Sequence, residues 1–205
     1  VLGVTRGPLE NAIHVQGHSF DGFDEIIFAT HSDQALRILG TEATPDEQHA
    51  LGSVQYQENR AVLHRDIRQM PQRRACWSSW VYRAQHDSIG VTYWMNLLQG
   101  IPESDPLFVT LNPADDIPDE LIYDDVQFAH PLFDGAAIRA QTMIQTMQGA
   151  NHTWFAGAYN RHGFHEDGIA SAMRVIRALN APELLKGDRY EIYGQRAEIS
   201  IPVGV

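Results

Sequence analysis

The residues best suited to chemistry lie between Thr153 and Leu179, in the segment TWFAGAYNRHGFHEDGIASAMRVIRAL. Its first residues are β-branched or aromatic, which favours a buried strand. A polar loop follows, and Asp167-Gly168 is predicted to open a helix with Asp167 as its N-cap. The free N–H groups of a helix start, together with the helix dipole, favour partial negative charge. The segment predicts either a binding element for an anion or carbonyl group, or an ordinary strand-to-helix connection.

Two histidines and a carboxylate in this loop could also bind a metal ion. His162, His165 and Glu166 are residue types that zinc uses as ligands. However, their spacing is not that of an HExxH motif, no further ligand is indicated, and Gly163 disfavours a regular helix there. We therefore expect no metal, and a metal-dependent hydrolase that uses these three residues is the least favoured alternative.

Two regions upstream must position this segment. Phe23–Thr30 (FDEIIFAT) contains the continuous apolar run expected of a strand covered on both faces. A helix capped by Ser32 or Asp33 is predicted to follow this strand and to end at Gly40. Short strands are expected over 1–5 and 12–16, and helices over 45–51 and 135–148.

Three β-type segments fill the middle of the chain, at 60–66, 75–82 and 88–97. Each tends to alternate apolar and polar residues, which is typical of an antiparallel sheet with one wet face. Aromatic residues concentrate here, either as a packed sheet face or as the wall of a substrate pocket. Tyr93 and Trp94 are the better candidates for such a wall.

Composition excludes several classes of protein. The chain has 205 residues, 43% of them hydrophobic, so it can bury a core. A net charge of −11 argues against a nucleic-acid partner. No apolar run approaches the ~20 residues of a transmembrane segment, and the N-terminus lacks the features of a signal peptide. The single cysteine, Cys76, suits a reducing compartment, so a cytoplasmic location is predicted.

The segment 153–179 resembles the C-terminal flavin-binding signature of the FAD-dependent amine oxidase and phytoene desaturase superfamily. The residues GAY…GFHEDG…S are most similar to the corresponding motif of the bacterial group of predicted NAD/FAD-binding, amine oxidase-like oxidoreductases. FDEIIFAT resembles a second family feature, a buried strand that re-enters the cofactor domain. The resemblance implies FAD as cofactor, with contacts from Ala29, Thr30, Gly157, Ala158, Tyr159, His165, Glu166, Asp167, Gly168 and Ile169. Many amine oxidases carry glutamate at the position of Ala158, so one carboxylate contact to the cofactor is expected to be lost.

The family's dinucleotide fingerprint, GxGxxG after an early strand, is missing from this chain. Because the first residue is Val and the resemblance covers roughly 23–179, we expect a C-terminal portion whose N-terminal FAD-binding segment lies elsewhere. The expected fold is α/β (α+β). It combines part of a Rossmann-like FAD-binding domain, without its N-terminal βαβ unit, with a substrate domain built on an antiparallel or mixed sheet.

The predicted domain boundaries follow from this resemblance. Residues 1–40 would form the hairpin and re-entrant strand of the FAD domain, 41–150 the substrate-binding domain, 151–181 the FAD-contacting strand, loop and helix, and 182–205 a tail. The predicted function is an FAD-dependent oxidoreductase that removes a hydride equivalent from a small or lipid-like substrate. No catalytic base can be named. A non-enzymatic α/β module that binds another anionic ligand is the alternative.

Overall fold

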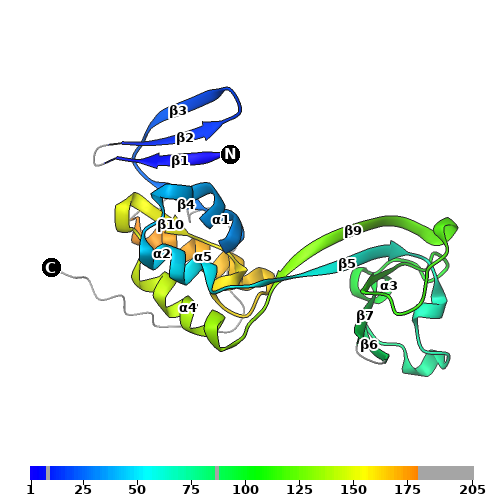
Figure 1. Ribbon diagram of the computed structural model, residues 1–205. Coiled ribbons are helices and arrows are strands. Elements are labelled where there is room, and N and C mark those ends of the chain that lie inside the picture. Colours follow the sequence, from blue (N-terminus) through cyan, green and yellow to red (C-terminus); the bar gives the residue numbers. More distant parts are fainter. Residues whose placement is uncertain (8–9, 86–87, 180–205) are drawn as a thin grey trace. The chain divides into compact units, whose positions relative to one another are not determined.

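The computed structural model describes residues 1–7, 10–85 and 88–179 (Figure 1). The chain divides into two compact units. Unit 1 contains residues 1–55 and the described residues from Pro131 onward, and unit 2 contains Tyr56–His130. The mixture of helices and sheets makes the fold α/β, as the sequence predicts. The predicted boundaries at 40/41 and 150/151 do not coincide with these units, since 41–55 and 131–150 both lie in unit 1. The predicted tail, 182–205, lies outside the described residues.

Unit 1 combines two small sheets with four α-helices. The antiparallel sheet has the order β1-β2-β3, and a second sheet pairs β4 and β10 in parallel. The strands are β1 (Gly3–Arg6), β2 (Asn11–Val15), β3 (His18–Phe23), β4 (Ile26–Phe28) and β10 (Thr153–Phe155). The helices are α1 (Ser32–Leu39), α2 (Pro45–Gly52), α4 (Gly135–Thr146) and α5 (His165–Ala178).

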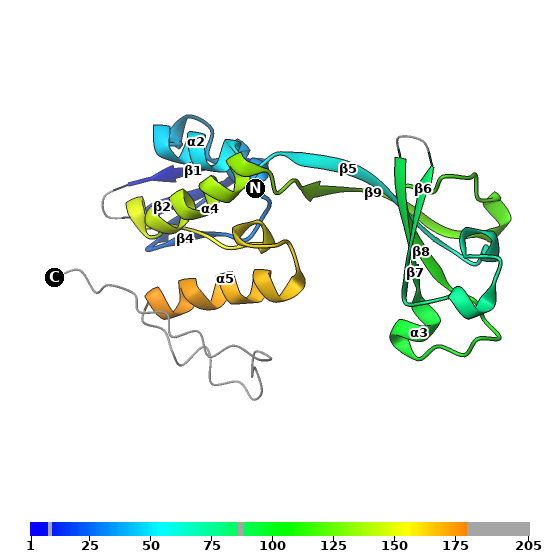
Figure 2. The same ribbon diagram turned by 90° about the horizontal axis from the view of Figure 1, so that it is seen from below.

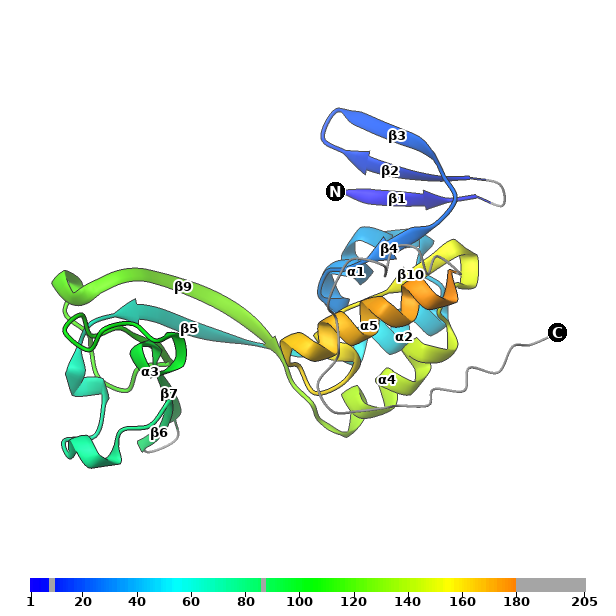
Figure 3. The same cartoon turned by 180° about the vertical axis from the view of Figure 1, so that it is seen from behind.

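The helices of unit 1 bury their apolar faces against one another and against β4 and β10. Helix α2 packs on both α1 and α4, while α5 lies along β10 (Figure 3). Leu39, Leu51 and Ile144 are buried, and the rings of Phe28 and Phe155 stack across the parallel pair with centroids 5.6 Å apart. This packing explains why 41–55 and 131–150 belong to unit 1, because α2 and α4 complete its core.

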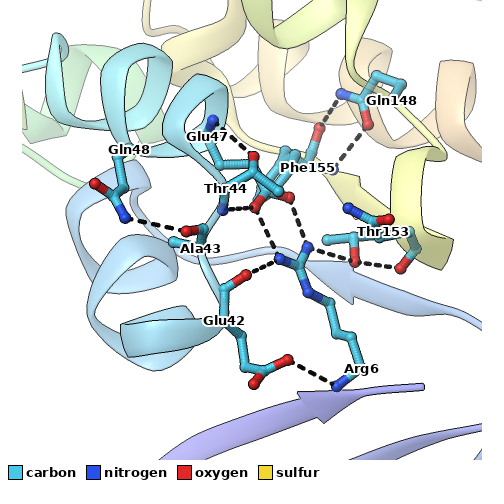
Figure 4. A network of polar contacts seen from close by, with 10 residues as sticks. Arg6, Glu42, Ala43, Thr44, Glu47, Gln48, Gln148, Thr153 and Phe155 are labelled. Carbon is cyan, nitrogen blue, oxygen red and sulfur yellow. Dashed lines mark hydrogen bonds and ion pairs between the residues drawn. The ribbon is translucent and has the colours of Figure 1, made fainter.

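A buried ion pair joins the antiparallel sheet to α2 and β10 (Figure 4). The guanidinium of Arg6 donates to both carboxylate oxygens of Glu47, at 2.6 and 2.9 Å, and to Thr153 Oγ1 at 3.3 Å. It also donates to the Glu42 carbonyl. Glu47 in turn accepts from the backbone N–H of Thr44, the N-cap of α2. Both charged side chains are about 95% buried, at 5% and 4% exposure.

Unit 2 is built on a five-stranded sheet with the order β6-β7-β8-β5-β9. Figure 2 shows β6, β7 and β8 side by side. Its elements are β5 (Tyr56–His64), β6 (Trp80–Gln85), β7 (Ser88–Trp94), the short helix α3 (Met95–Gln99), β8 (Phe108–Leu111) and β9 (Ile122–Pro131). The core packs on one face of this sheet, where Met70, Trp94 and Phe108 cluster with Trp77.

Several elements differ from the sequence-based prediction. Strands β3 and β9 were not predicted, because β3 is exposed throughout and β9 is mostly exposed and carries carboxylates. Pairing with neighbours, including a 2.7 Å ion pair between Arg60 of β5 and Asp125 of β9, gives such polar segments a strand conformation. Helix α1 begins at Ser32 with His31 as its N-cap, one residue before the predicted cap positions. Ile138 of α4, expected to face inward, is exposed.

Across the described ranges, no helix is both long enough and apolar enough to cross a membrane.

Candidate functional site

The parallel pair β4 and β10 brings the two segments singled out from the sequence together. Thr153, Trp154 and Phe155 pair with Ile26, Ile27 and Phe28, and the Ala156 N–H donates to the Phe28 carbonyl at 2.8 Å. Both strands therefore end at the same edge of the sheet, and each runs into a loop and a helix start, α1 after β4 and α5 after β10. In open α/β sheets, ligands bind beyond the carboxyl ends of the strands.

The other edge of β10 is closed by the turn that follows α4. The Gln148 side chain donates to the Phe155 carbonyl at 2.8 Å and accepts from the Phe155 N–H at 2.9 Å (Figure 4). The Gly149 N–H donates to the Thr153 carbonyl at 2.9 Å. These bonds satisfy the backbone of β10 on its outer edge, so the strand end that carries Gly157 is held from both sides.

Helix α5 begins three residues earlier than predicted. Its first residue is His165 and its N-cap is Phe164, so Asp167 occupies the third helical position. The N–H groups of Asp167 and Gly168 both donate to the Phe164 carbonyl, at 3.0 and 3.3 Å. The prediction that these two N–H groups are free for a ligand is therefore wrong. The free donors of the helix start are those of His165 and Glu166, which by position lack an intrahelical acceptor.

Asp167 is the third residue of a capping box and not the N-cap, and its side chain holds the loop onto the helix. One carboxylate oxygen, Oδ2, accepts from the backbone N–H groups of His162 and Phe164, each at 3.1 Å, and the side chain is buried. Ser171, one turn further along, accepts from the Gly157 N–H at 2.8 Å and donates to the Gly168 carbonyl at 2.7 Å. The sequence prediction included Ser171 only as the last residue of the motif that resembles the family. In the structure, its hydroxyl joins the end of β10 to α5.

The position of the Tyr159 ring leaves no room for a side chain at Gly157. A Cβ at Gly157 would lie 2.5 Å from Cε1 and 2.8 Å from Cδ1 of the buried Tyr159 ring, closer than real Cβ contacts come. At Gly168 the nearest heavy atom to a Cβ would be the Ala158 nitrogen at 3.8 Å, an ordinary contact. The two glycines therefore play different roles. The close contact at Gly157 is with the protein itself, whereas Gly168 has room for a Cβ in ordinary contact with Ala158.

This difference predicts opposite effects of the same substitution. Gly157→Ala should lower the free energy of unfolding by about 1–3 kcal/mol, because the Tyr159 ring must move. Gly168→Ala should raise it by up to about 1 kcal/mol, because alanine is the better residue inside a helix. Urea unfolding of both variants measures the difference. Equal stabilities for the two would contradict this assignment, and Gly157→Ala combined with Tyr159→Leu should recover part of the loss.

Two arginines, Arg161 and Arg174, lie beside the carboxylates of the first turn of α5, Glu166 and Asp167. Arg161 Nε lies 3.8 Å from Asp167 Oδ1. Burial lowers the pKa of the Arg174 guanidinium, and the charge of Arg161 lowers it further, while Asp167 opposes the shift. The guanidinium groups of Arg161 and Arg174 thus both interact electrostatically with the carboxylate of Asp167. The sequence did not single out Arg161 or Arg174, because an arginine on a polar loop and one in the middle of a helix give no distinctive signal.

Asn160 is also buried at this edge. Its side-chain nitrogen donates to the Gly157 carbonyl at 3.1 Å, and its Oδ1 has no hydrogen-bond partner among the described residues. A buried amide oxygen without a partner costs free energy unless a donor from outside the chain reaches it. This atom is the kind of group that a bound ligand can satisfy.

The remaining predicted cofactor residues lie around this edge with different exposures. Ala29, His165, Glu166 and Ile169 are exposed, Thr30 and Ala158 are half-buried, and Tyr159 is buried. His162, His165 and Glu166 do not form a metal site. Throughout the part of the chain that the structure describes, no group of three His, Cys, Asp or Glu side chains could hold a metal ion.

The predicted substrate residues of unit 2 lie on opposite faces of β7. Trp94 is buried in the core, where its ring meets Trp77 edge to face at 5.3 Å and its Nε1 donates to Asn96. Tyr93 faces the other side and meets Trp80 at 5.5 Å. Adjacent residues of a strand point to opposite faces, so one wall cannot contain both side chains.

Tyr93 belongs to an apolar surface of unit 2 that we call the open face. The registers of β5, β6, β7 and β8 place ten apolar residues on this side of the sheet, opposite the core, and seven of them, without Ala61, Ala84 and Ile89, define the open face. The seven are Leu63, Trp80, Tyr82, Val91, Tyr93, Val109 and Leu111. Trp80 and Tyr82 are 47% and 66% exposed, and none of the seven is fully buried.

The core side of the same sheet contains a buried polar chain that sequence analysis missed. The Asp66 N–H donates to His64 Nδ1 at 3.0 Å, so His64 Nε2 carries the proton and donates to Thr110 Oγ1 at 2.7 Å. Thr110 and Thr92 share a hydrogen bond of 2.9 Å. Burial lowers the pKa of His64 to about 4, although the charge of Asp66 opposes the shift. His64 is therefore a neutral structural residue, and alternating polar residues on a strand gave no sign of its burial.

Comparison with known proteins supports the fold. No protein-family model matches the sequence, and no curated protein matches it. Among solved structures, the chain is similar to the crystal structure of a CLA-producing fatty acid isomerase from P. acnes, with a TM-score of 0.57 and 13% identity. The match covers 86% of this chain and 46% of that one, so this chain spans less than half the length of the isomerase. At this identity the likeness concerns the fold alone.

Proposed function

We propose that this chain is part of an FAD-dependent oxidoreductase of the amine oxidase and phytoene desaturase superfamily. The observation that carries the proposal is the parallel pair of β4 and β10, each followed by a loop and a helix start at one edge of the sheet. The two segments that resemble family motifs thereby meet in space. A flavin has carbonyl oxygens and phosphates, which are ligands that such an edge binds through backbone N–H groups.

The residues at this edge fit one side of a flavin. The lack of a side chain at Gly168 would let a planar ring approach the backbone of α5. The first N–H groups of the helix, from His165 and Glu166, suit a carbonyl oxygen on which negative charge develops. Asn160 Oδ1 offers a buried acceptor to a donor of the ligand, and Arg161 and Arg174 add positive charge for an anion.

Bound FAD would supply the hydride acceptor, and this chain would supply binding and electrostatics. Helix α5 would stabilise negative charge on the reduced ring through its dipole and free N–H groups. Asp167 and Ser171 would act one step away from the ligand, by holding the loop and the end of β10 in place. Because no residue is identified as a base, the proposal assigns proton transfer to none of them.

The substrate in this proposal is a small organic or lipid-like molecule. The fatty acid isomerase whose fold is similar supports the lipid-like choice. The open face supports it too, because its seven side chains are apolar or aromatic.

Flavin binding tests this function directly. The chain, expressed together with any residues that precede Val1 in its gene, should purify yellow or take up added FAD and show flavin absorbance. Gly168→Val should reduce flavin occupancy at least about tenfold, because its side chain would occupy the approach to α5, where a Cβ makes an ordinary contact with the Ala158 nitrogen at 3.8 Å. Ala178→Val, in the last turn of the same helix, is the matched control and should leave occupancy unchanged.

Two results would contradict the proposal. One is a folded protein that stays colourless with excess FAD, which would favour the non-enzymatic ligand-binding module. The other is a flavoprotein whose occupancy is the same in wild type, Gly168→Val and Ala178→Val. That result would remove α5 from the flavin site.

A further inference from the structure

The open face of unit 2 is the largest feature that the flavin proposal leaves without a defined role. Its residues form two rows across the strands. One row contains Leu63, Val109, Tyr93 and Trp80, and the next contains Leu111, Val91 and Tyr82. None of these side chains is charged at neutral pH, and burial, followed by the nearby Tyr82, raises the pKa of Tyr93 further above neutrality. A continuous apolar surface of this kind needs an apolar partner.

A positive charge lies at one end of this surface. Arg65 follows β5 two residues after Leu63, and its N–H continues the strand pairing by donating to the Leu121 carbonyl at 3.0 Å. Alternation along the chain places it on the same side as Leu63. Its guanidinium donates to the Glu120 carbonyl at 3.3 Å, which leaves the charge without a counter-ion.

Arg65 differs in this respect from most arginines of unit 2. Arg60, Arg68, Arg74 and Arg83 each pair with a carboxylate at 2.5–2.7 Å. Within residues 1–7, 10–85 and 88–179, no carboxylate lies within ion-pairing distance of Arg65. An apolar surface that ends in an uncompensated cation is complementary to a molecule with an apolar chain and an anionic head.

We propose that the open face binds the hydrocarbon chain of a fatty acid and that Arg65 pairs with its carboxylate. This inference specifies the substrate of the flavoenzyme proposed above and rests on that function for its chemistry. An amine substrate fits less well, because none of the seven side chains of the open face is a carboxylate that could pair with an ammonium group. The hydrocarbon chain would run along β5, which rises about 3.3 Å per residue, across the two apolar rows.

Three ligands of one chain length separate the parts of this proposal. Isothermal titration of the 205-residue chain with decanoate, decanol and decylamine, each below its micellar concentration, should show decanoate binding tightest. Tyr82→Asp should weaken decanoate and decanol at least about tenfold, because it places a charge on the apolar surface. Leu97→Asp, an exposed leucine of α3, is the matched control and should change neither.

A separate pair of variants tests the role of the Arg65 charge. Arg65→Glu should weaken decanoate about fivefold or more and leave decanol unchanged, since only the acid needs the cation. Arg73→Glu, another exposed arginine of unit 2, should affect neither ligand. The proposal is overturned if decanoate does not bind, if decylamine binds more tightly, or if Arg65→Glu weakens decanol as much as decanoate. A concentration-dependent dimer that Tyr82→Asp abolishes would also overturn it, because a second copy would then cover the face.

None of these titrations needs flavin. If decanoate binds as described but the protein takes up no FAD, the proposed redox function fails and the fatty acid site stands. If FAD binds but decanoate does not, the reverse holds.

Discussion

Arg6→Met should destabilise the chain by about 3–5 kcal/mol, because it leaves the buried carboxylate of Glu47 without its counter-ion. The pair is almost fully enclosed, and Arg6 also bonds Thr153 and the Glu42 carbonyl. Burial raises the pKa of Glu47, but the bonds from Arg6 and Thr44 outweigh this, and the net shift is downward. The carboxylate therefore stays ionised in the folded protein, and its isolation is costly. Urea unfolding measures the loss.

A second substitution distinguishes charge isolation from lost packing. Arg6→Met combined with Glu47→Gln should recover part of the stability, because the buried charge is gone while the amide oxygen can still accept from the Thr44 N–H. The exposed pair of Arg37 and Asp33, at 3.5 Å, provides the control, and Arg37→Met should cost at most about 0.5 kcal/mol. If Arg6→Met were as mild as Arg37→Met, the pair would not hold β1 to α2.

The second large effect is a loss of stability as the pH falls, caused by His64. Its pKa is about 4 in the folded protein and near 6.5 when unfolded, so between these values the unfolded state binds a proton that the folded state does not. The contribution of this residue to the free energy of unfolding is complete above pH 6.5. Below that pH it falls by about 1.4 kcal/mol per pH unit, and the total loss at pH 4 is about 3 kcal/mol. The affected contacts are those with Thr110 and the Asp66 N–H.

His64→Gln isolates this contribution, because an amide can donate to Thr110 and accept from the Asp66 N–H without titrating. The difference in unfolding free energy between wild type and variant should change across pH 4–6.5 by the amount given above, and should be constant above pH 7. The fluorescence of Trp77, Trp80 and Trp94 reports mainly on unit 2, which holds three of the four tryptophans. A parallel pH profile for the two proteins would contradict the assignment of His64.

Local signals accounted for much of the fold. The apolar run of Ile26 to Ala29 predicted β4, and the helix expected over 135–148 corresponds to α4, which Asp134 caps by accepting from the N–H groups of Ala136 and Ala137. Residue type and spacing suffice for such features, because a cap or a buried strand is a property of a few neighbouring residues. Strands β3 and β9 escaped prediction because their conformation depends on partners distant in sequence.

At the candidate site, too, contacts that local sequence signals do not reveal limited what could be predicted. Asp167-Gly168 has the composition of a helix start, yet the helix begins at His165, because the Asp167 carboxylate binds loop N–H groups that precede the helix. Gly157 was assigned to a close ligand approach, whereas its neighbour is the ring of Tyr159. In both cases a side chain from the same loop competes for the role that the motif suggested.

By itself, the sequence determined the α/β class and the approximate location of the strand, loop and helix in 153–179, because hydrophobic periodicity, glycines and caps act over short distances. Only the tertiary structure decided that β4 and β10 run side by side in parallel, that Trp94 is core while Tyr93 lies on the open face, and that Arg65 lacks a counter-ion. These facts depend on strand register and on which side chains meet across the fold. Neither can be read from the order of residues along the chain.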